Sequence, residues 1–231
     1  MTVGRTLAAA PPPPTSAAAV FGVRLELAVR YAELLATEGV LRGLIGPREA
    51  VRLWDRHLLN CAVVGELIEA DARVGDLGSG AGLPGIALAI ARPDLRIELI
   101  EPLQRRAAFL RDAVSSLGLD GPVSVLRSRG EDAQRDGYDV VVARAVAALD
   151  RLVPVALPLA RLGGTLLAIK GAAAAAELAV AARVIDRAGG AHAELMKAGA
   201  GKVEPATVVI AVRRARIVPI VRPTNARGRR A

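Results

Sequence analysis

The sequence is poor in three kinds of residue, and each scarcity excludes something. Cys61 is the only cysteine, so a disulfide within the chain, and with it a disulfide-stapled scaffold, is excluded. Aromatic residues make up 2% of the chain, too few for the rows of stacked side chains that bind single-stranded nucleic acid of any sequence. Only three of the 31 basic residues are lysines; the others are arginines, which suit bidentate phosphate contacts better.

A long uninterrupted apolar run is also missing. The longest apolar region, residues 152–169, is broken by two prolines, an arginine and a Gly-Gly pair, whereas a membrane-spanning helix needs roughly 20 apolar residues. Residues 1–19 are rich in proline and alanine and lack the basic start and apolar core of a secretory signal. We therefore expect a disordered N-terminal arm over 1–19, no membrane partner and, given the single cysteine, a cytoplasmic location.

Positive charge is concentrated at the C-terminal end. The net charge is +8, and residues 213–231 contain seven arginines and no acidic residue, so the rest of the chain is close to neutral. A basic segment on a near-neutral body favours a polyanionic partner. A disordered tail that only keeps the protein in solution is the alternative. In either case we expect a basic disordered tail over 214–231.

Hydrophobic periodicity predicts helices first and a sheet afterwards. Apolar residues repeat at helical spacing over 20–38, and a second helix is expected from Pro47 to about residue 69. From residue 73 onward, short β-like runs alternate with helical stretches, which is typical of βαβ units and a parallel, doubly wound sheet. Strands are expected at 73–77, 96–101, 122–127, 138–143, 164–170, 191–197 and 206–213, with helices at 84–92, 104–118, 149–160 and 172–188 and a short piece near 131–135.

The segment between the last two predicted strands is too short for a helical crossover, so these strands should pair antiparallel. The expected fold class is therefore α/β, with a Rossmann-like, seven-stranded, mostly parallel sheet whose last strand is antiparallel. We expect one domain over 20–213, in which N-terminal helices at 20–70 precede the Rossmann-like core at 73–213.

The segment "GDLGSGAGLPGIALAI", which starts at residue 75, places several glycines at one strand-to-helix junction. Ligands of doubly wound sheets bind at the carboxyl ends of strands, and glycine lets the backbone turn sharply and lie against a ligand. Two ligand classes use such a loop. Gly80, Gly82 and Gly85 fit the G-x-G-x-x-G of dinucleotide-binding proteins, while Asp76, Gly78, Gly80 and Gly82 fit the acid-x-Gly-x-Gly-x-Gly loop that packs against S-adenosylmethionine (SAM).

Asp76 helps to distinguish these two ligands. A carboxylate two residues before the first glycine suits the ammonium group of SAM and would repel a pyrophosphate. Glu101, at the end of the second predicted strand, can accept both ribose hydroxyls of either cofactor, so it predicts a nucleoside ligand without choosing between them. An exposed acid at a strand end is the alternative for Glu101. The seven-strand pattern with its final hairpin favours SAM.

Five segments in order, "DLGSGAGLPGIALAI", "RRAAFLRDAVSSLGL", "RSRGED", "DVVVARAVAAL" and "LLAIKG", resemble the RsmG (GidB) family of bacterial 16S ribosomal RNA methyltransferases. The resemblance runs from about residue 47 to 171 and includes the upstream "DRHLLN". It implies the class I SAM-dependent methyltransferase fold, SAM as cofactor, and methylation of N7 of a guanine in the decoding-region (530) loop of 16S rRNA. It also implies cofactor contacts at Gly78, Leu83, Gly130, Glu131 and Arg144.

Guanine N7 carries a free lone pair, so its attack on a methyl group requires no proton removal. We therefore expect no catalytic base and no metal, with the rate coming from alignment of the reacting atoms. Because the methylated base is cationic, Arg144 is expected to hold the SAM carboxylate or an RNA phosphate. The candidates for RNA contacts are Arg52, Arg56, His57, Lys170, Arg213 and Arg214, although a core or capping role for His57 is an equal alternative.

Three other functions remain open from the sequence. An NAD-dependent oxidoreductase would use the embedded G-x-G-x-x-G, but Asp76 and the final hairpin disfavour it. A non-catalytic assembly factor would bind rRNA without transferring a methyl group. A small-molecule methyltransferase would leave the basic tail without a purpose. The sequence therefore favours an enzyme that acts on rRNA in the small ribosomal subunit, and we expect it to be a monomer.

Overall fold

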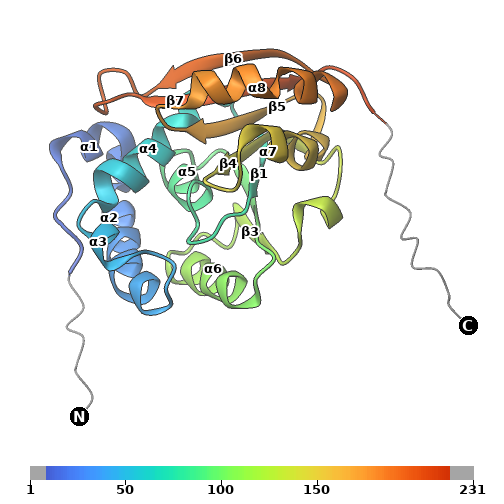
Figure 1. Ribbon diagram of the computed structural model, residues 1–231. Coiled ribbons are helices and arrows are strands. Elements are labelled where there is room, and N and C mark those ends of the chain that lie inside the picture. Colours follow the sequence, from blue (N-terminus) through green and yellow to red (C-terminus); the bar gives the residue numbers. More distant parts are fainter. Residues whose placement is uncertain (1–8, 219–231) are drawn as a thin grey trace, which may run out of the picture.

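The computed structural model describes residues 9–218, which contain a seven-stranded sheet (Figure 1). The strand order is β3-β2-β1-β4-β5-β7-β6. Pairings among β1 to β5 are parallel, whereas β7 is antiparallel to both neighbours. The predicted sheet is therefore confirmed. The bounds are β1 Arg73–Leu77, β2 Arg96–Ile100, β3 Val123–Leu126, β4 Tyr138–Arg144, β5 Ala160–Lys170, β6 Gly190–Ala198 and β7 Thr207–Arg214.

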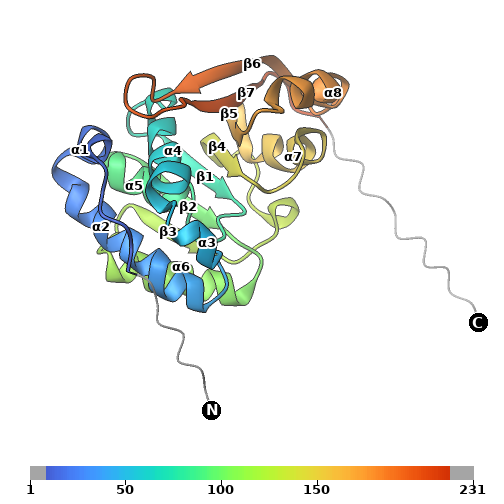
Figure 2. The ribbon, with the colours of Figure 1, turned by 60° about the vertical axis from the view of Figure 1, so that its left-hand side comes forward.

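Helices cover both faces of the sheet because its central strands are apolar on both sides. In β4, Val140 and Val142 belong to one hydrophobic core, while Val141 and Ala143 belong to another. The first face carries the N-terminal helices with α5 (Gly85–Ala91) and α6 (Gln104–Ser116), and the second carries α7 (Leu149–Ala156) and α8 (Ala174–Arg187) (Figure 1, Figure 2). The N-terminal helices thus share a core with the sheet.

The N-terminal region is divided into shorter helical pieces than the periodicity predicts. Most residues from 57 to 65 are buried, whereas a surface helix buries only one stripe. This segment is therefore a core element. It begins at the end of a π-helical turn, Leu53–Leu58, of the kind that is frequent at functional sites. The pieces are α1 (Thr15–Phe21), η1 (Gly22–Arg24), α2 (Leu25–Leu34), the π-helical η2 (Leu35–Gly39), α3 (Pro47–Ala50), the π-helical η3 (Leu53–Leu58), α4 (Leu59–Ala62) and η4 (Val63–Leu67).

Residues 9–19 do not form the disordered arm that their composition predicts. The side chain of Ala17 in α1 is fully buried, and the indole Nε1 of Trp54 donates a hydrogen bond to the carbonyl of Pro11 at 2.8 Å. The rings of Phe21 and Trp54 meet edge to face with centroids 6.3 Å apart. This aromatic pair anchors the Pro/Ala-rich stretch, which composition alone could not indicate. Residues 1–8 of the predicted arm lie outside the described residues.

The segment predicted as a basic tail begins within the fold. β7 continues to Arg214, and the backbone N–H groups of Ala215 and Arg216 donate to the carbonyl of Gly189 at 2.9 and 3.1 Å. The predicted tail boundary at 214 is therefore too early. The remainder, residues 219–231, contains four of the seven arginines and lies outside the described residues.

Prolines account for the difference between the predicted and observed bounds around β5. The helix expected over 149–160 ends at Ala156 and is followed by a 3-10 turn, η6 (Leu157–Leu159), after which β5 starts at Ala160. Pro158, just after the end of α7, lacks the N–H that a continuing helix needs, whereas Pro154 lies within α7. No helix between residues 9 and 218 is both long enough and apolar enough to cross a bilayer.

Candidate cofactor and substrate site

The loops that follow β1, β2 and β4 meet where these strands end, at the carboxyl edge of the sheet. The N–H of Gly78 donates to the carbonyl of Ile100 at 2.9 Å, and the N–H of Gly80 donates to Oε2 of Glu101 at 3.0 Å. A Cβ placed on Gly78 would lie 2.8 Å from the side chain of Val146, in the loop after β4. Only glycine therefore fits at residue 78, between the ends of β2 and β4.

Tyr31 of α2 holds the glycine-rich loop that follows β1. The buried Tyr31 hydroxyl donates a hydrogen bond to the carbonyl of Ala81 at 2.8 Å, and a Cβ on Gly82 would lie 2.8 Å from the same hydroxyl. Gly82 also has a φ of 94°, in the region that side-chain-bearing residues avoid. The loop therefore has a fixed backbone path across the carboxyl edge, with Leu83 buried beside it.

Asp76 is a buried carboxyl group with one oxygen that lacks a hydrogen-bond partner among the described residues. Its side chain is fully buried, and Oδ2 accepts the N–H of Gly85 at 3.0 Å. Oδ1 has no hydrogen-bond partner among residues 9–218. Burial raises the pKa of the carboxyl group to about 7, against the opposing effect of the Gly85 amide. A buried carboxylate oxygen without a partner is unfavourable, so its natural complement is a cationic ligand group, and the ammonium group of SAM fits this requirement.

Glu101 is buried at the end of β2, so it is not the exposed strand-end acid of the alternative interpretation. Its Oε2 accepts the Gly80 amide at 3.0 Å, and its Oε1 accepts the amide of Leu103 at 2.9 Å. Each carboxylate oxygen has a second lone pair. Both oxygens are therefore oriented by the backbone and retain the capacity to accept a ribose hydroxyl.

The turn after β3 completes the carboxyl edge. Gly130 begins a 3-10 turn, η5 (Gly130–Asp132), and is buried. A Cβ at this glycine would lie 2.6 Å from the side chain of Val155 and 2.7 Å from that of Leu77, so its absence lets the turn pack against α7 and the end of β1. Glu131, the next residue, is exposed. The structure thus brings the nine predicted cofactor residues from four strand ends to one edge.

A cavity of about 690 Å³ opens beside this edge, at the ends of β4 and β5. Its polar lining comes from the N-terminal helical region, from β4, from the end of β5 and from α8. The polar and charged residues that line it are Glu49, Arg56, His57, Asn60, Arg144, Lys170 and Glu177. A space of this volume is large enough for a nucleobase-sized ligand.

Arg144 lines the cavity and contacts two buried residues of the N-terminal helical region. Its Nη1 donates to Sγ of Cys61 at 3.0 Å, and its Nη2 contacts Nδ1 of His57. Arg144 takes part in none of the ion pairs formed within residues 9–218. Its positive charge nevertheless acts to lower the pKa of Asp76. Asp76 of β1 pairs with Val142 of β4, two residues before Arg144, so the two opposite charges lie on the same face of the sheet without forming an ion pair.

His57 is not the phosphate-binding cation that the sequence predicted. Its side chain is mostly buried, and Nε2 lies 3.0 Å from Oε2 of Glu49. Burial first, and the charge of Arg144 second, lower the pKa of His57 to about 4, although Glu49 acts in the opposite direction. The ring is therefore neutral at physiological pH, which agrees with the core role that the sequence left open.

Lys170 lies in the cavity wall but is already paired. Its Nζ donates to the carbonyl of Ala147 at 2.8 Å and to Oε2 of Glu177 at 2.7 Å. The same Glu177 oxygen accepts the N–H of Leu149 at 3.0 Å, at the start of α7. These bonds tie the loop after β4 to β5 and α8, so Lys170 shapes the cavity in addition to adding charge to its wall.

Arg52 and Arg56 are exposed on the segment that flanks the cavity. The N–H of Arg56 donates to the carbonyl of Arg52 at 3.0 Å, as the predicted i,i+4 spacing requires. Arg56 lines the cavity and lies 3.4 Å from Oε1 of Glu49. Both guanidinium groups therefore stay available to phosphates at the cavity mouth.

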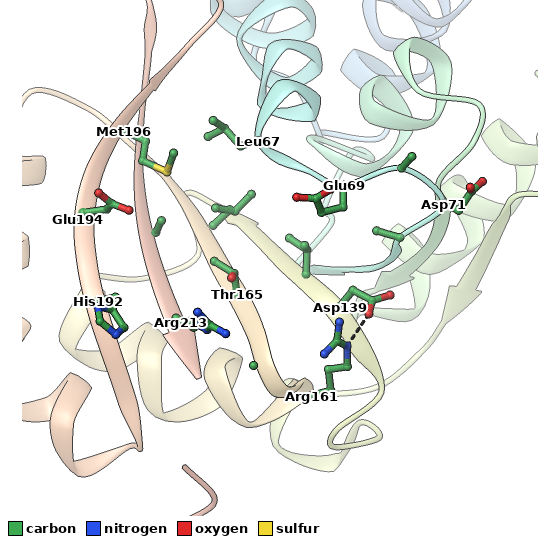
Figure 3. A pocket seen from close by; sticks show the side chains of 16 residues that line it. Leu67, Glu69, Asp71, Asp139, Arg161, Thr165, His192, Glu194, Met196 and Arg213 are labelled. Atoms are coloured by element: carbon green, nitrogen blue, oxygen red, sulfur yellow. Dashed lines mark hydrogen bonds and ion pairs between the residues drawn. The ribbon is translucent and has the colours of Figure 1, made fainter. Parts of the chain in front are cut away.

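Arg213 and Arg214 lie at the opposite, amino edge of the sheet. Arg214 is 4% exposed and donates to the carboxylate of Asp136 and to the carbonyl of Pro158, so its predicted RNA contact is wrong; it holds the last strand to the turn before β4. Arg213 lines a second cavity of about 700 Å³, in which it lies between His192 and Arg161 (Figure 3). The structure does not bring either arginine to the cofactor residues.

Sequence reasoning missed Tyr31, Glu49, Cys61 and Glu177 as parts of this site. Tyr31 contacts the glycine loop across 50 residues, and Arg144 meets Cys61 and His57 across 83 and 87. No local spacing carries such a signal, because only the folded sheet brings these segments together.

Within residues 9–218, no cluster of three or more His, Cys, Asp or Glu side chains is arranged to hold a metal ion.

Comparison with known proteins gives a consistent result. The family described as "rRNA small subunit methyltransferase G" (GidB) matches residues 24–204. The chain is 55% identical over 218 residues to ribosomal RNA small subunit methyltransferase G of Salinispora tropica, which covers 91% of this chain and 90% of the relative. It is 54% identical over 194 residues to the protein of that name from Renibacterium salmoninarum, covering 84% and 90%.

Solved structures resemble this fold at lower identity. The mitomycin 7-O-methyltransferase MmcR superimposes with a TM-score of 0.58 at 20% identity, over 80% of this chain and 60% of that one. This likeness shows the fold alone, and the fold is that of class I SAM-dependent methyltransferases, as predicted. The dinucleotide-dependent oxidoreductase is not supported by any of these matches. The extent and identity of the family match show that the chain belongs to the rRNA small subunit methyltransferase G family.

Proposed function

We propose that this protein transfers a methyl group from SAM to N7 of a guanine in the decoding-region (530) loop of 16S rRNA. The observation that carries the proposal is a pair of opposite charges at the carboxyl edge of the sheet, Asp76 and Arg144, which form no ion pair within residues 9–218; Arg144 also lines the cavity there. Family membership supplies the substrate class, rRNA of the small ribosomal subunit. We place the reaction in the cytoplasm and expect a monomeric enzyme.

The charges at this edge match the amino-acid end of the cofactor. Asp76 Oδ1, buried and without a partner among residues 9–218, is assigned to the ammonium group. The N–H groups of Arg144 other than those that contact Cys61 and His57 are assigned to the carboxylate. Glu101 is assigned to the ribose hydroxyls, and Gly130 with Glu131 to the adenine edge. When bound, SAM supplies an electrophilic methyl group on a sulfonium.

The protonation states of the cavity residues support N7 as the target. His57 has a pKa of about 4, and its Nδ1 faces Arg144. Hydrogen bonds from His57 and Lys170 hold the pKa values of Glu49 and Glu177 below the usual value. These three groups are therefore poor proton acceptors, which suits attack by an atom whose lone pair is already free. The protein would then act by orienting the base and the cofactor.

Basic residues around the cavity are assigned to the RNA backbone. A positive side chain next to N7 would oppose the charge that develops on the methylated guanine. Arg52 and Arg56, exposed beside the cavity, are therefore assigned to phosphates of the loop. Lys170, bonded to Glu177, is assigned to shaping the wall.

The experiment that tests this proposal is methyl transfer from labelled SAM to small ribosomal subunits that lack the modification. Large subunits serve as the control substrate, and nuclease digestion identifies the labelled nucleoside. We expect label in 7-methylguanosine at one position of 16S rRNA. Label in another nucleoside would overturn the N7 assignment, and binding of small subunits without transfer would favour an assembly factor instead.

A further inference from the structure

We propose that His57 is a positioning residue that, supported by Glu49, holds the guanidinium of Arg144 away from Asp76 and keeps both charges free for the zwitterionic end of the cofactor. The inference rests on the proposed function for the identity of that ligand. The contact between His57 and Arg144 does not depend on it.

The partners of His57 fix its tautomer. An arginine has only N–H donors, so Nδ1 of His57 must accept from Nη2 of Arg144. The proton of the neutral ring then resides on Nε2, which donates to Oε2 of Glu49 at 3.0 Å. The resulting chain of hydrogen bonds runs in one direction, from Arg144 through His57 to Glu49.

The site needs such a device because its two charges attract each other. Asp76 pairs with Val142 of the neighbouring strand β4, two residues before Arg144 and on the same face of the sheet, and Asp76 Oδ1 has no partner among the described residues. If the guanidinium were free to move, pairing with Asp76 would satisfy both groups and close the site to an ammonium group. His57 Nδ1 and Cys61 Sγ offer the guanidinium two acceptors other than the Asp76 carboxylate.

The held guanidinium retains the capacity to bind a ligand. Arg144 has five N–H groups, and the structure assigns one to Cys61 and one to His57. The side chain is only partly buried and lines the cavity. The remaining donors can therefore take a carboxylate, while Asp76 takes the ammonium group of the same molecule.

Two substitutions separate the roles of the two ring nitrogens. In His57→Asn, the amide oxygen can take the place of Nδ1, because both atoms lie two bonds from Cβ, but the contact with Glu49 is lost. In His57→Gln, the amide nitrogen can take the place of Nε2 and keep the contact with Glu49, but no acceptor remains at Nδ1. His192→Gln, at the amino edge (Figure 3), is the control.

The readout is the dissociation constant for SAM and for 5′-methylthioadenosine, which lacks the amino-acid moiety. We expect His57→Gln to raise the dissociation constant for SAM at least tenfold and to leave the dissociation constant for methylthioadenosine within twofold of the wild-type value. His57→Asn should keep the dissociation constant for SAM within about threefold of the wild-type value. Equal losses of SAM in both variants, or parallel losses of both ligands in His57→Gln, would mean that His57 only fills space and would overturn the proposal.

Ring ¹⁵N NMR tests the contact without any ligand. The chain has two histidines, so the His192→Gln spectrum assigns His57 directly. We expect a neutral ring protonated at Nε2 at pH 7, and in Arg144→Ala a mixture of tautomers. An Nδ1–H tautomer in the wild type refutes the proposal. If the tautomer is as expected but wild-type protein binds no SAM, the proposed function fails while the His57–Arg144 contact stands.

Discussion

The two edges of the sheet contain cavities of nearly equal volume, about 690 Å³ at the carboxyl edge and about 700 Å³ at the amino edge. They differ in whether the nearby carboxylate has its hydrogen bonds satisfied. At the amino edge, Asp139 accepts Nε of Arg161 at 2.6 Å and the N–H of Arg73 at 2.8 Å. The hydrogen bond from Arg161 holds the pKa of Asp139 below its usual value. At the carboxyl edge, Asp76 has a raised pKa and a buried oxygen that accepts no hydrogen bond from the part of the chain that the structure describes.

Cavity volume therefore does not identify the functional edge of this protein. The ion pair between Asp139 and Arg161 is solvated and satisfied without a ligand, and such pairs contribute about 0–1 kcal/mol. The buried carboxylate of Asp76 destabilises the protein until a cation reaches it, and buried groups without partners are rare enough to require a reason. The difference teaches that unsatisfied polar atoms indicate a binding site better than empty space does.

Asp76→Asn should give the largest effect: loss of measurable SAM binding together with a more stable unliganded protein. The pKa of Asp76 is about 7 in the fold and about 4 in the unfolded chain. A pKa raised by folding favours the native state at low pH, and that contribution disappears as the pH rises from about 4 to about 7. At pH 8 the ionised carboxylate therefore costs on the order of 4 kcal/mol, which the amide avoids.

Urea denaturation at pH 5 and pH 8, with calorimetric titration of SAM, measures both effects of this substitution. The matched control is Asp139→Asn at the amino edge, which should cost less than about 1 kcal/mol and leave SAM affinity unchanged. If Asp139→Asn weakened SAM as much as Asp76→Asn does, the distinction between the edges would be lost.

Arg144→Ala should weaken SAM binding by roughly ten- to a hundredfold, the range expected when a hydrogen bond to a charged group is lost. Arg213→Ala, at the amino edge, should leave it within twofold. Titration of SAM and the KM for small ribosomal subunits distinguish the two roles proposed for Arg144. A change in the KM for the subunits alone would assign Arg144 to an RNA phosphate, and no change in either would refute both roles.

The affinity for SAM should fall about tenfold for each pH unit below about 7, because the ammonium group requires the ionised form of Asp76. Binding near pH 6.5 should release a proton, which calorimetry in buffers of different ionisation enthalpy detects. Asp139→Asn should follow the same profile as the wild type. A dissociation constant that stays level from pH 5.5 to 8 would show that Asp76 does not titrate with ligand binding.

Local signals in the sequence were sufficient to predict the sheet and to predict that the candidate cofactor residues meet at its carboxyl edge. The strand lengths, the glycine segment and the acids at the strand ends are each visible in a short local stretch of sequence. Because neighbouring parallel strands end at the same edge of a sheet, these local signals also predict which residues meet there. The same reasoning failed for Arg214, because a basic run looks the same whether it is buried or exposed. Its burial depends on Asp136 and Pro158, which are brought beside it by the fold.

The role of His57 illustrates the other limit of the sequence. "DRHLLN" indicates a histidine on a helical segment, but the charge of that histidine is decided by burial and by Arg144, 87 residues away. The prediction that residues 9–19 are disordered failed for a similar reason, because the contact that holds them comes from Trp54, which is distant in the sequence. Contacts between distant segments set these outcomes, and a single sequence does not display them.

Removing residues 219–231 should give the smallest effect, a change in salt dependence of binding to small subunits rather than in SAM affinity. This segment contains four arginines, and each phosphate contact contributes roughly 0.7 to the log–log salt slope. The slope should therefore decrease by up to about 2.8. The cut belongs after Val218, because truncation at residue 212 would remove the end of β7 and the buried Arg214.

A full-length variant with glutamine at these four positions controls for chain length. If charge is responsible, this variant and the truncation should lose the same salt dependence, and both should keep wild-type methyl transfer at low salt, where phosphate contacts at the cavity mouth suffice. An unchanged slope in both would make the basic segment a spectator. The polyanion would then be recognised by the carboxyl edge alone, where Arg52 and Arg56 are exposed.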